Sequence, residues 1–319
     1  MPDRNYSGVL LIGDPHLEGR QPGFRKDDYP QVILQKLTWA LDYADEHRLL
    51  PAILGDLFDK PRDNPNWLLY HLLGILRARE VLALYGNHDV HFNPELTADD
   101  SLQLLVQAGV LRLVTAEDPW RGIMNGRTVI VGGSSYRHDI PESFAAGETA
   151  DGNPPLVMWL THHDILIPGY DDGRIKPREI AGVDLLVNGH IHRRLEPVEC
   201  GRTTWITPGN ISRRSRNDAS KLHVPSVLAV TVQPDSYAVD YVTVPHQPFD
   251  EVFHAGVIET IVEDRPSSFV EGLAELQARR TDSGAGLMHF LEQNVGQFAP
   301  PVTEEIRRLA SEVLSEARV

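Results

Sequence analysis

Short apolar runs alternate with segments of helical periodicity along most of the chain, which is the pattern of a layered α/β domain. Six runs have the length of a buried strand, namely residues 9–12, 52–54, 81–84, 128–131, 157–160 and 183–187. Between the first two runs, apolar residues from Val32 to Ala44 recur at helical spacing, and Pro30 fits the start of this helix. Two later runs, 227–232 and 238–244, flank Pro234-Asp235 and predict an antiparallel hairpin.

The composition changes near residue 248. Residues 247–319 contain 13 acidic and 6 basic residues and show helical periodicity, which is clearest in the apolar stripe from Ile306 to Ala317. We therefore expect a main domain over residues 1–247 and a helical appendage over residues 248–319. The stripe is typical of ordinary packing, with the docking of a partner helix as the alternative.

Composition excludes several classes of protein. The chain has 319 residues, of which 41% are hydrophobic and 24% are charged, as in ordinary globular proteins. Its single cysteine, Cys200, excludes an internal disulfide framework and a cysteine-rich zinc site. No apolar run reaches 18 residues, and the N-terminus lacks the pattern of a signal peptide. We therefore expect no membrane segment and a cytoplasmic location.

Charge is distributed unevenly along the chain. The 30 basic and 45 acidic residues give a formal net charge of −15, which argues against a general nucleic-acid coat protein. Residues 190–221, the basic segment, are an exception with seven basic and three acidic residues. The segment has two interpretations, a surface that contacts nucleic-acid phosphates and a solvated loop whose arginines pair with acidic neighbours.

Short clusters of Asp, Asn and His residues follow five of the predicted strands. The clusters are Asp14 to His16, Asp56 to Asp59, Asn87 to Asp89, His162 to Asp164 and His190 to His192. Ligands collect at the carboxyl ends of strands in α/β sheets, so we expect the five clusters to converge. Mixed carboxylate, amide and imidazole ligands favour manganese, iron or zinc over magnesium or calcium. Two such ions about 3.5–4 Å apart clamp a phosphate and activate water, which predicts hydrolysis of a phosphate ester.

The order D-x-H, G-D-x-x-D, G-N-H-D, a strand-terminal His and G-H-x-H resembles the calcineurin-like metallophosphoesterase superfamily. All five motifs are present in order over residues 14–192. The resemblance implies an α/β fold, a four-layer αββα sandwich that forms the catalytic domain over residues 1–247. It also implies a cofactor of two divalent metal ions, manganese in the first place, with iron or zinc as alternatives.

Carried over by motif, seven residues would hold the two ions. One ion would be held by Asp14, His16, Asp56 and His192, and the second by Asp56, Asn87, His162 and His190. His88 would protonate the leaving oxygen or stabilise the transition state, and Asp89 would orient His88.

Three positions close to the motifs need a separate interpretation. His162 and His163 are adjacent, so strand alternation lets only one of them face the metals, and the family pattern favours His162. Asp59 is expected to brace its loop rather than to bind metal. Residues 132–135, Gly-Gly-Ser-Ser, lack the Gly-Lys-Ser signature of a phosphate loop, and we expect a simple turn there.

A finer resemblance, over about residues 7–245, is to SbcD-like exonucleases, the bacterial and phage branch of the Mre–Rad repair nucleases. It is carried by residues 55–59 with the Pro-containing loop 60–63, by residues 189–193, and by the Ile-Thr-Pro-Gly-Asn stretch 206–210. Two features depart from the pattern, Val90-His91 after the third motif and a short C-terminal region. The finer resemblance implies DNA as substrate, an SbcC/Rad-type ATPase partner, a homodimer, and phosphate contacts by Arg193, Arg213 and Arg214.

Two other functions stand beside the nuclease. The first is a phosphatase or a small-molecule phosphodiesterase that acts on cyclic nucleotides. Protein phosphatases of the superfamily usually carry G-D-x-x-D-R-G, whereas Lys60-Pro61 follows the second motif here. The second is a non-catalytic scaffold, which the complete set of ligand positions disfavours.

Overall fold

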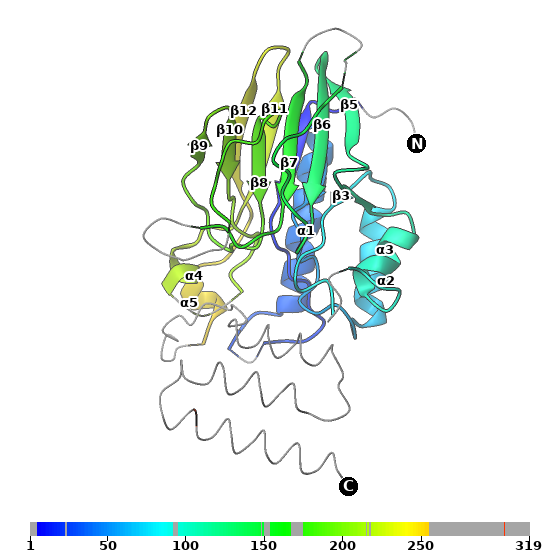
Figure 1. The fold of residues 1–319 in the computed structure, drawn as a ribbon. Coiled ribbons are helices and arrows are strands. Elements are labelled where there is room, and N and C mark those ends of the chain that lie inside the picture. Colours follow the sequence, from blue (N-terminus) through cyan, green and yellow to red (C-terminus); the bar gives the residue numbers. More distant parts are fainter. Residues whose placement is uncertain are drawn as a thin grey trace. The chain divides into compact units, whose positions relative to one another are not determined.

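The computed structural model describes residues 5–254 except 23, 92–94, 148, 150–153, 167–174, 215 and 217, together with residue 303. The chain divides into two compact units, Met1–Thr260 and Ile261–Val319. All of the named helices and strands belong to the first unit (Figure 1). Of the helical appendage predicted over residues 248–319, the part beyond residue 254 lies outside the described residues apart from Thr303. The appendage stays a prediction, together with the domain boundary at residue 247.

Two six-stranded sheets form the first unit (Figure 1). The first sheet has the order β12 (Tyr237–Thr243), β11 (Ser226–Val232), β1 (Gly8–Ile12), β2 (Leu49–Ile53), β3 (Leu82–Ala83) and β4 (Arg112–Leu113). The second has the order β5 (Trp120–Met124), β6 (Arg127–Ser134), β7 (Leu156–Thr161), β8 (Leu185–Asn188), β10 (Thr203–Ile206) and β9 (Val198–Cys200). The strands from β1 to β4 are parallel, as are β6, β7, β8 and β10.

The strand β1 shows why its sequence is a continuous apolar run. All five of its residues are buried. Val9 and Leu11 belong to the core between the two sheets, whereas Leu10 and Ile12 belong to the core between the first sheet and the helices. Successive side chains of a strand point to opposite faces, so a strand covered on both faces needs apolar residues at every position.

Helices cover the outer face of the first sheet. They are α1 (Tyr29–Glu46), α2 (Asn66–Leu76) and α3 (Ser101–Gln107). The helix α1 begins at the predicted place, with Pro30 in its first turn and the Asp28 carboxylate accepting a hydrogen bond from the Gln31 amide. Such a cap satisfies a backbone donor that the helix itself leaves unpaired. Two shorter helices, α4 (Asp218–Leu222) and α5 (Phe249–Val252), complete the set in the described residues.

Connecting segments cover the outer face of the second sheet. A third apolar core surrounds the buried Trp159 there, with Ile140, Phe144 and Ile180 contributed by the connections. No described residue over this face belongs to a helix. The two packed sheets with helices on the first confirm the mixed α/β sandwich predicted from the sequence.

The turn predicted for residues 132–135 is wrong. Residues 132–134 are part of β6. A side chain at Gly132 would collide with the indole ring of Trp159, and the Trp159 Nε1 atom donates a hydrogen bond to the Ser134 hydroxyl. The glycine therefore serves the close packing of an aromatic ring on a strand rather than a turn.

No described helix combines the length and the apolar composition that crossing a bilayer requires.

Candidate metal centre

The five polar clusters converge as predicted from their places after the strands. They follow β1, β2, β3, β7 and β8. Three groups of side chains bring their ligand atoms within 4.8 Å of one another. The first group is Asp14, His16, Asp56 and His192, and the second is Asp56, His162 and His190. A third group shares His16 with the first and consists of His16, Asp59 and His88. In Figure 1 the arrowheads of β6 and β7 point to the end of the sandwich at which α4 and α5 lie. This end is where parallel strands present ligands.

The first group is held together around two imidazoles. The Nε2 atoms of His16 and His192 are 2.9 Å apart, and the Nε2 atom of His16 is 3.5 Å from Oδ2 of Asp56. The Oδ1 atom of Asp14 accepts a hydrogen bond from the His190 amide, while its Oδ2 is buried without a hydrogen-bond partner in the described residues. Facing imidazole nitrogens and an orphaned buried carboxylate oxygen are what a divalent cation would satisfy.

The second group is centred on the side chain of Asn87. Its Oδ1 atom lies 3.2 Å from Nε2 of His162 and 3.0 Å from Nδ1 of His190. The Oδ2 atom of Asp56 is 3.4 Å from the same His162 nitrogen. Asp56 therefore belongs to both groups, the position expected of a carboxylate that bridges two cations.

The two adjacent histidines after β7 point to different partners. His162 is buried in the second group, where its Nδ1 atom donates to the Leu54 carbonyl and leaves Nε2 for a ligand. The Nε2 atom of His163 instead lies 2.7 Å from the His138 carbonyl. The structure thus places His162, the residue favoured by the sequence, among the candidate ligands, whereas His163 contacts a different partner.

The backbone is strained at the centre. Asp14, His16, Asp56 and His190 all have positive φ angles, of 38°, 46°, 46° and 67°. Residues with a Cβ rarely adopt this region, and such outliers concentrate at functional sites. Gly86 is also constrained, because a side chain there would collide with the Asp56 carboxylate and the His162 ring.

Electrostatics favour added positive charge at the centre. Burial raises the pKa of Asp14 to about 7, and burial next to Asp56 raises the pKa of Asp89 to about 7 as well. Burial also opposes ionisation of Asp56, but the neighbouring His162 and His88 outweigh it and hold its pKa well below the usual range. Three buried carboxylates in one place are costly unless they are paired or coordinate cations. The residues therefore fit divalent metal ions.

His88 lies at the edge of the first group. Its ring centroid is 4.8 Å from that of His16, and its Nδ1 atom donates to the Asp59 carbonyl at 2.8 Å. The carboxylate of Asp59 forms an ion pair with Arg214. Asp59 therefore holds His88 through its carbonyl and an arginine beside the centre through its carboxylate, which the sequence did not indicate. Because Asp59 also belongs to the third group of possible ligands, its expected role as a loop brace rather than a ligand stays a prediction.

The orienting role predicted for Asp89 is not what the contacts show. Its buried carboxylate accepts hydrogen bonds from three backbone amides, those of Leu57, Phe58 and Gly86. No contact in the described residues joins it to the ring of His88, whose partner is the Asp59 carbonyl. Asp89 fixes the two loops that carry Asp56 and Asn87, because a buried carboxylate satisfies several amides at once.

The three arginines predicted to contact substrate separate in the structure. Arg214 stays near the centre, where its charge contributes after burial to lowering the pKa values of His16 and His192. Arg213 donates instead to the carbonyls of His223 and Gln247. Arg193 lines a hollow on β11 and β12 beside Arg194, whose guanidinium lies 3.5 Å from the ring centroid of Tyr241.

Asn188 is a structural support that the motifs did not single out. It is buried, its Oδ1 atom accepts hydrogen bonds from the Thr161 hydroxyl and the His163 amide, and its Nδ2 atom donates to the His163 and Gly189 carbonyls. It ties the loop after β7 to the loop after β8. Its position in the sequence, at the end of an apolar run and directly before G-H-x-H, could have indicated this supporting role.

The two packed sheets and the convergent Asp, Asn and His side chains define the class of α/β proteins with a candidate centre for divalent metal ions at one end of the sandwich. Residues 8–194 match the family of calcineurin-like phosphoesterases, and the chain belongs to this family. Membership indicates a metal-dependent hydrolase of phosphoesters, and the family usually binds two divalent metals. The broad resemblance seen in the sequence is confirmed.

Solved structures that resemble the chain are distant in sequence. The protein TT1561 of Thermus thermophilus is 12% identical, with 74% of this chain and 99% of that chain covered and a TM-score of 0.41. A conserved uncharacterised protein of Streptococcus pneumoniae, described as a predicted phosphoesterase, is 13% identical, with 78% and 94% covered and a TM-score of 0.35. Vps29 of Chaetomium thermophilum is 15% identical, with 75% and 96% covered and a TM-score of 0.32. No curated protein matches the chain in sequence.

Proposed function

We propose that this protein is a metal-dependent nuclease of the SbcD type, which hydrolyses phosphodiesters of DNA at a centre for two divalent ions, manganese in the cell. The observation that carries the proposal is the shared position of Asp56 between two groups of ligand atoms. Asp14, His16, Asp56 and His192 would hold one ion, and Asp56, Asn87, His162 and His190 the other. When bound, the ions would supply positive charge for the phosphate oxygens and activate the attacking water.

His88 is the candidate for proton transfer. Its Nδ1 atom faces a carbonyl, which only accepts hydrogen bonds, so this nitrogen carries a proton and the ring orientation is fixed. The Nε2 atom is left for the substrate. A histidine held in this way can deliver a proton to the leaving oxygen or stabilise charge on the phosphate.

DNA is the proposed substrate because the basic segment adjoins the centre. Residues 190–221 carry a net charge of +4 in a chain of −15. Arg214, from this segment, lies beside the first group through its ion pair with Asp59, and its side chain keeps 21% exposure. Phosphate contacts of this kind position a nucleic-acid backbone without reading its sequence.

A second candidate is a phosphodiesterase for small molecules such as cyclic nucleotides. The acidic total charge favours it, as does the direction of Arg213, whose hydrogen bonds lead away from the metal ligands. This candidate uses the same centre and the same His88. The two candidate functions differ only in the part of the substrate that lies beyond the scissile phosphate.

The test is cleavage by the full-length protein with manganese of end-labelled single- and double-stranded DNA, with bis-p-nitrophenyl phosphate alongside. Cleavage of both, lost in Asp56→Asn, supports the nuclease. Cleavage of the small diester alone excludes it for the isolated chain and favours the small-molecule enzyme. Absence of any cleavage at full metal loading would overturn the catalytic assignment.

The SbcC/Rad-type ATPase partner and the homodimer are proposals that rest on the finer resemblance. Light scattering of the purified chain tests the homodimer. Addition of an SbcC/Rad-type ATPase with ATP to the DNA assay tests the partner, which should raise cleavage of double-stranded DNA and leave the small diester unchanged.

A further inference from the structure

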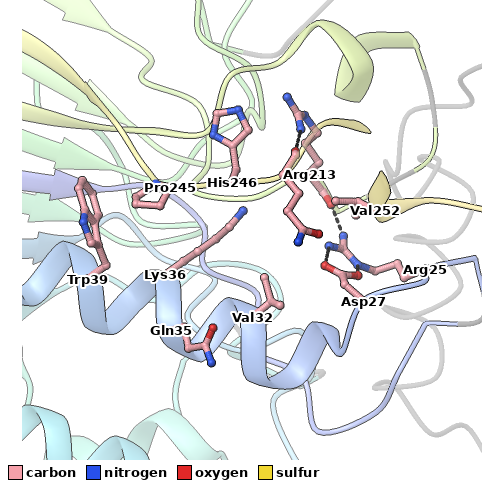
Figure 2. Close-up of a pocket in the computed structure, with 11 residues that line it drawn as sticks. Arg25, Asp27, Val32, Gln35, Lys36, Trp39, Arg213, Pro245, His246 and Val252 are labelled. Carbon is pink, nitrogen blue, oxygen red and sulfur yellow. Dashed lines mark hydrogen bonds and ion pairs between the residues drawn. The ribbon is translucent and has the colours of Figure 1, made fainter. Parts of the chain in front are cut away.

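A cavity of about 530 Å³ opens between α1, the basic segment and residues 245–252 (Figure 2). None of its lining residues belongs to either group of metal ligands. The volume lies within the range of sites that hold small organic ligands.

Lys36 is the unusual residue of this cavity. It lies on the buried face of α1 and is only 8% exposed. Figure 2 shows its side chain running from the helix into the cavity, on the side of His246. Within the described part of the chain, no hydrogen bond or ion pair reaches its Nζ atom. An ammonium group almost never occupies such a position without a partner.

The other charges around the cavity do not compensate Lys36. The lining holds two further cations, Arg25 and Arg213, and one acid, Asp27. Arg25 already engages both oxygens of Asp27, at 2.8 Å each, and its remaining nitrogen donates to the Arg213 carbonyl. Burial together with the charges of Arg25 and Arg213 lowers the pKa of Lys36 to about 7. The cavity therefore has an excess of positive charge in a poorly solvated place.

The cavity also offers a second polar group and a flat apolar wall. The Nδ1 atom of His246 faces the Val244 carbonyl, at 2.7 Å, which leaves its Nε2 atom for a ligand. Figure 2 shows Trp39 on one side of Lys36 and Arg213 on the other. An anionic group near Lys36 would thus have an aromatic surface at its side.

We propose that this cavity is a binding site for a phosphate group, carried by a small phosphorylated molecule of up to nucleotide size. The phosphate oxygens accept hydrogen bonds from Lys36 and add the negative charge that the lining lacks. The organic portion packs against Trp39. The site goes beyond the proposed hydrolysis, because its residues take no part in holding metal or in proton transfer.

The experiment compares thermal unfolding of the full-length protein with its Lys36→Met variant in rising concentrations of inorganic phosphate and of AMP. Each titration is done with manganese and again with EDTA, because phosphate bound at the metal centre disappears with EDTA and is unaffected by Lys36→Met. Lys221→Met is the matched control, since it removes the same charge from an exposed position.

We expect the wild-type Tm to rise with ligand in EDTA as well as in manganese, and the Kd to weaken at least tenfold in Lys36→Met. Without ligand, Lys36→Met should have the higher Tm, because it removes a buried unpaired charge. Lys221→Met should follow the wild type. Tighter binding of AMP than of phosphate identifies an organic phosphate as the ligand, and equal binding identifies free phosphate.

Three results would overturn the site. They are stabilisation that vanishes entirely in EDTA, an unchanged Kd in Lys36→Met, and a lower Tm of that variant without ligand. If Lys36→Met does not fold, Lys36→Gln provides the same comparison. Hydrolysis of bis-p-nitrophenyl phosphate should stay unchanged in Lys36→Met, so that failure of this site and failure of the nuclease proposal are separate results.

Discussion

The Oδ2 atom of Asp56 lies 3.4 Å from the Nε2 atom of His162. The same oxygen is 3.5 Å from His16, so one carboxylate atom faces an imidazole of each ligand group. Replacement of Asp56 should therefore affect both ions, whereas replacement of any other ligand should affect one.

We expect Asp56→Asn to lose most bound metal and at least a hundredfold in turnover, because an amide has no negative charge to share between two cations. Metal content by mass spectrometry and hydrolysis of bis-p-nitrophenyl phosphate measure the two effects. Asp27→Asn, which changes a carboxylate outside the groups of candidate ligands, is the control. Retention of two ions by Asp56→Asn would contradict the bridging role.

Removal of metal should lower the stability of the protein, because the buried carboxylates of Asp14 and Asp56 then lack the compensating charge of the ions. An ion present at a hundred times its Kd adds about 2.7 kcal/mol to the free energy of unfolding. Calorimetry with EDTA, and again after addition of manganese, should show a Tm that falls and recovers. A Tm indifferent to both additions would mean that the centre holds no ion.

His88→Ala should spare metal binding and lower kcat by about 10²–10⁴-fold, the usual contribution of proton transfer. The ring belongs to neither the first nor the second group of candidate ligands, so its removal leaves both of these groups in place. Metal content and steady-state kinetics separate the two effects. His163→Ala is the comparison, because that ring contacts the His138 carbonyl and should leave turnover within a few-fold. If His88→Ala kept full activity, His88 would have no part in the mechanism.

Arg214→Ala should weaken DNA cleavage at least tenfold while hydrolysis of the small diester changes little. Each lost phosphate contact also reduces the salt slope of binding by about one. The measurement is cleavage at several salt concentrations, with Arg202→Ala, an exposed arginine of the same basic segment, as control. If Arg214→Ala lowered the cleavage rates of DNA and of the small diester equally, Arg214 would act on the metal centre rather than on the DNA backbone.

Stability should depend on pH through Lys36. Its pKa falls from 10.5 in the unfolded chain to about 7 in the folded protein, so the unfolded state binds more protons between these values. Stability therefore rises with pH across this interval, by up to about 1.4 kcal/mol per unit. Arg25, Arg213, Asp27 and His246 are the other charged or titratable groups that line the cavity.

The measurement is denaturant unfolding of wild type and Lys36→Met from pH 7 to pH 10. The advantage of Lys36→Met over the wild type should shrink as the pH rises, because the wild-type lysine must release a proton on folding and this release costs less free energy at higher pH. A constant difference between the two proteins would show that Lys36 keeps an ordinary pKa.

The eight strands and the long helix predicted from apolar patterns all form, and so does the convergence of the five polar clusters. These features are local, because a buried strand needs an apolar run and its carboxyl end determines where the next residues lie. Missed strands lack that signal. The strand β4 has two residues, and β9 is largely exposed.

Only the tertiary structure decided which of two adjacent residues faces the metal centre. His162 turns to the ligands because the Leu54 carbonyl, 108 residues away, accepts its other nitrogen, while His163 finds the His138 carbonyl. Arg214 meets Asp59, while Arg213 meets the carbonyls of His223 and Gln247.

The sequence by itself determined which residues could carry the chemistry and at which strand ends they stand, because these depend on order and periodicity along the chain. The partners of Asp89 and the isolation of Lys36 depend on segments that meet only after folding. Hydrogen bonds and burial arise from contacts between segments that are distant along the chain, and the order of residues alone does not specify these contacts.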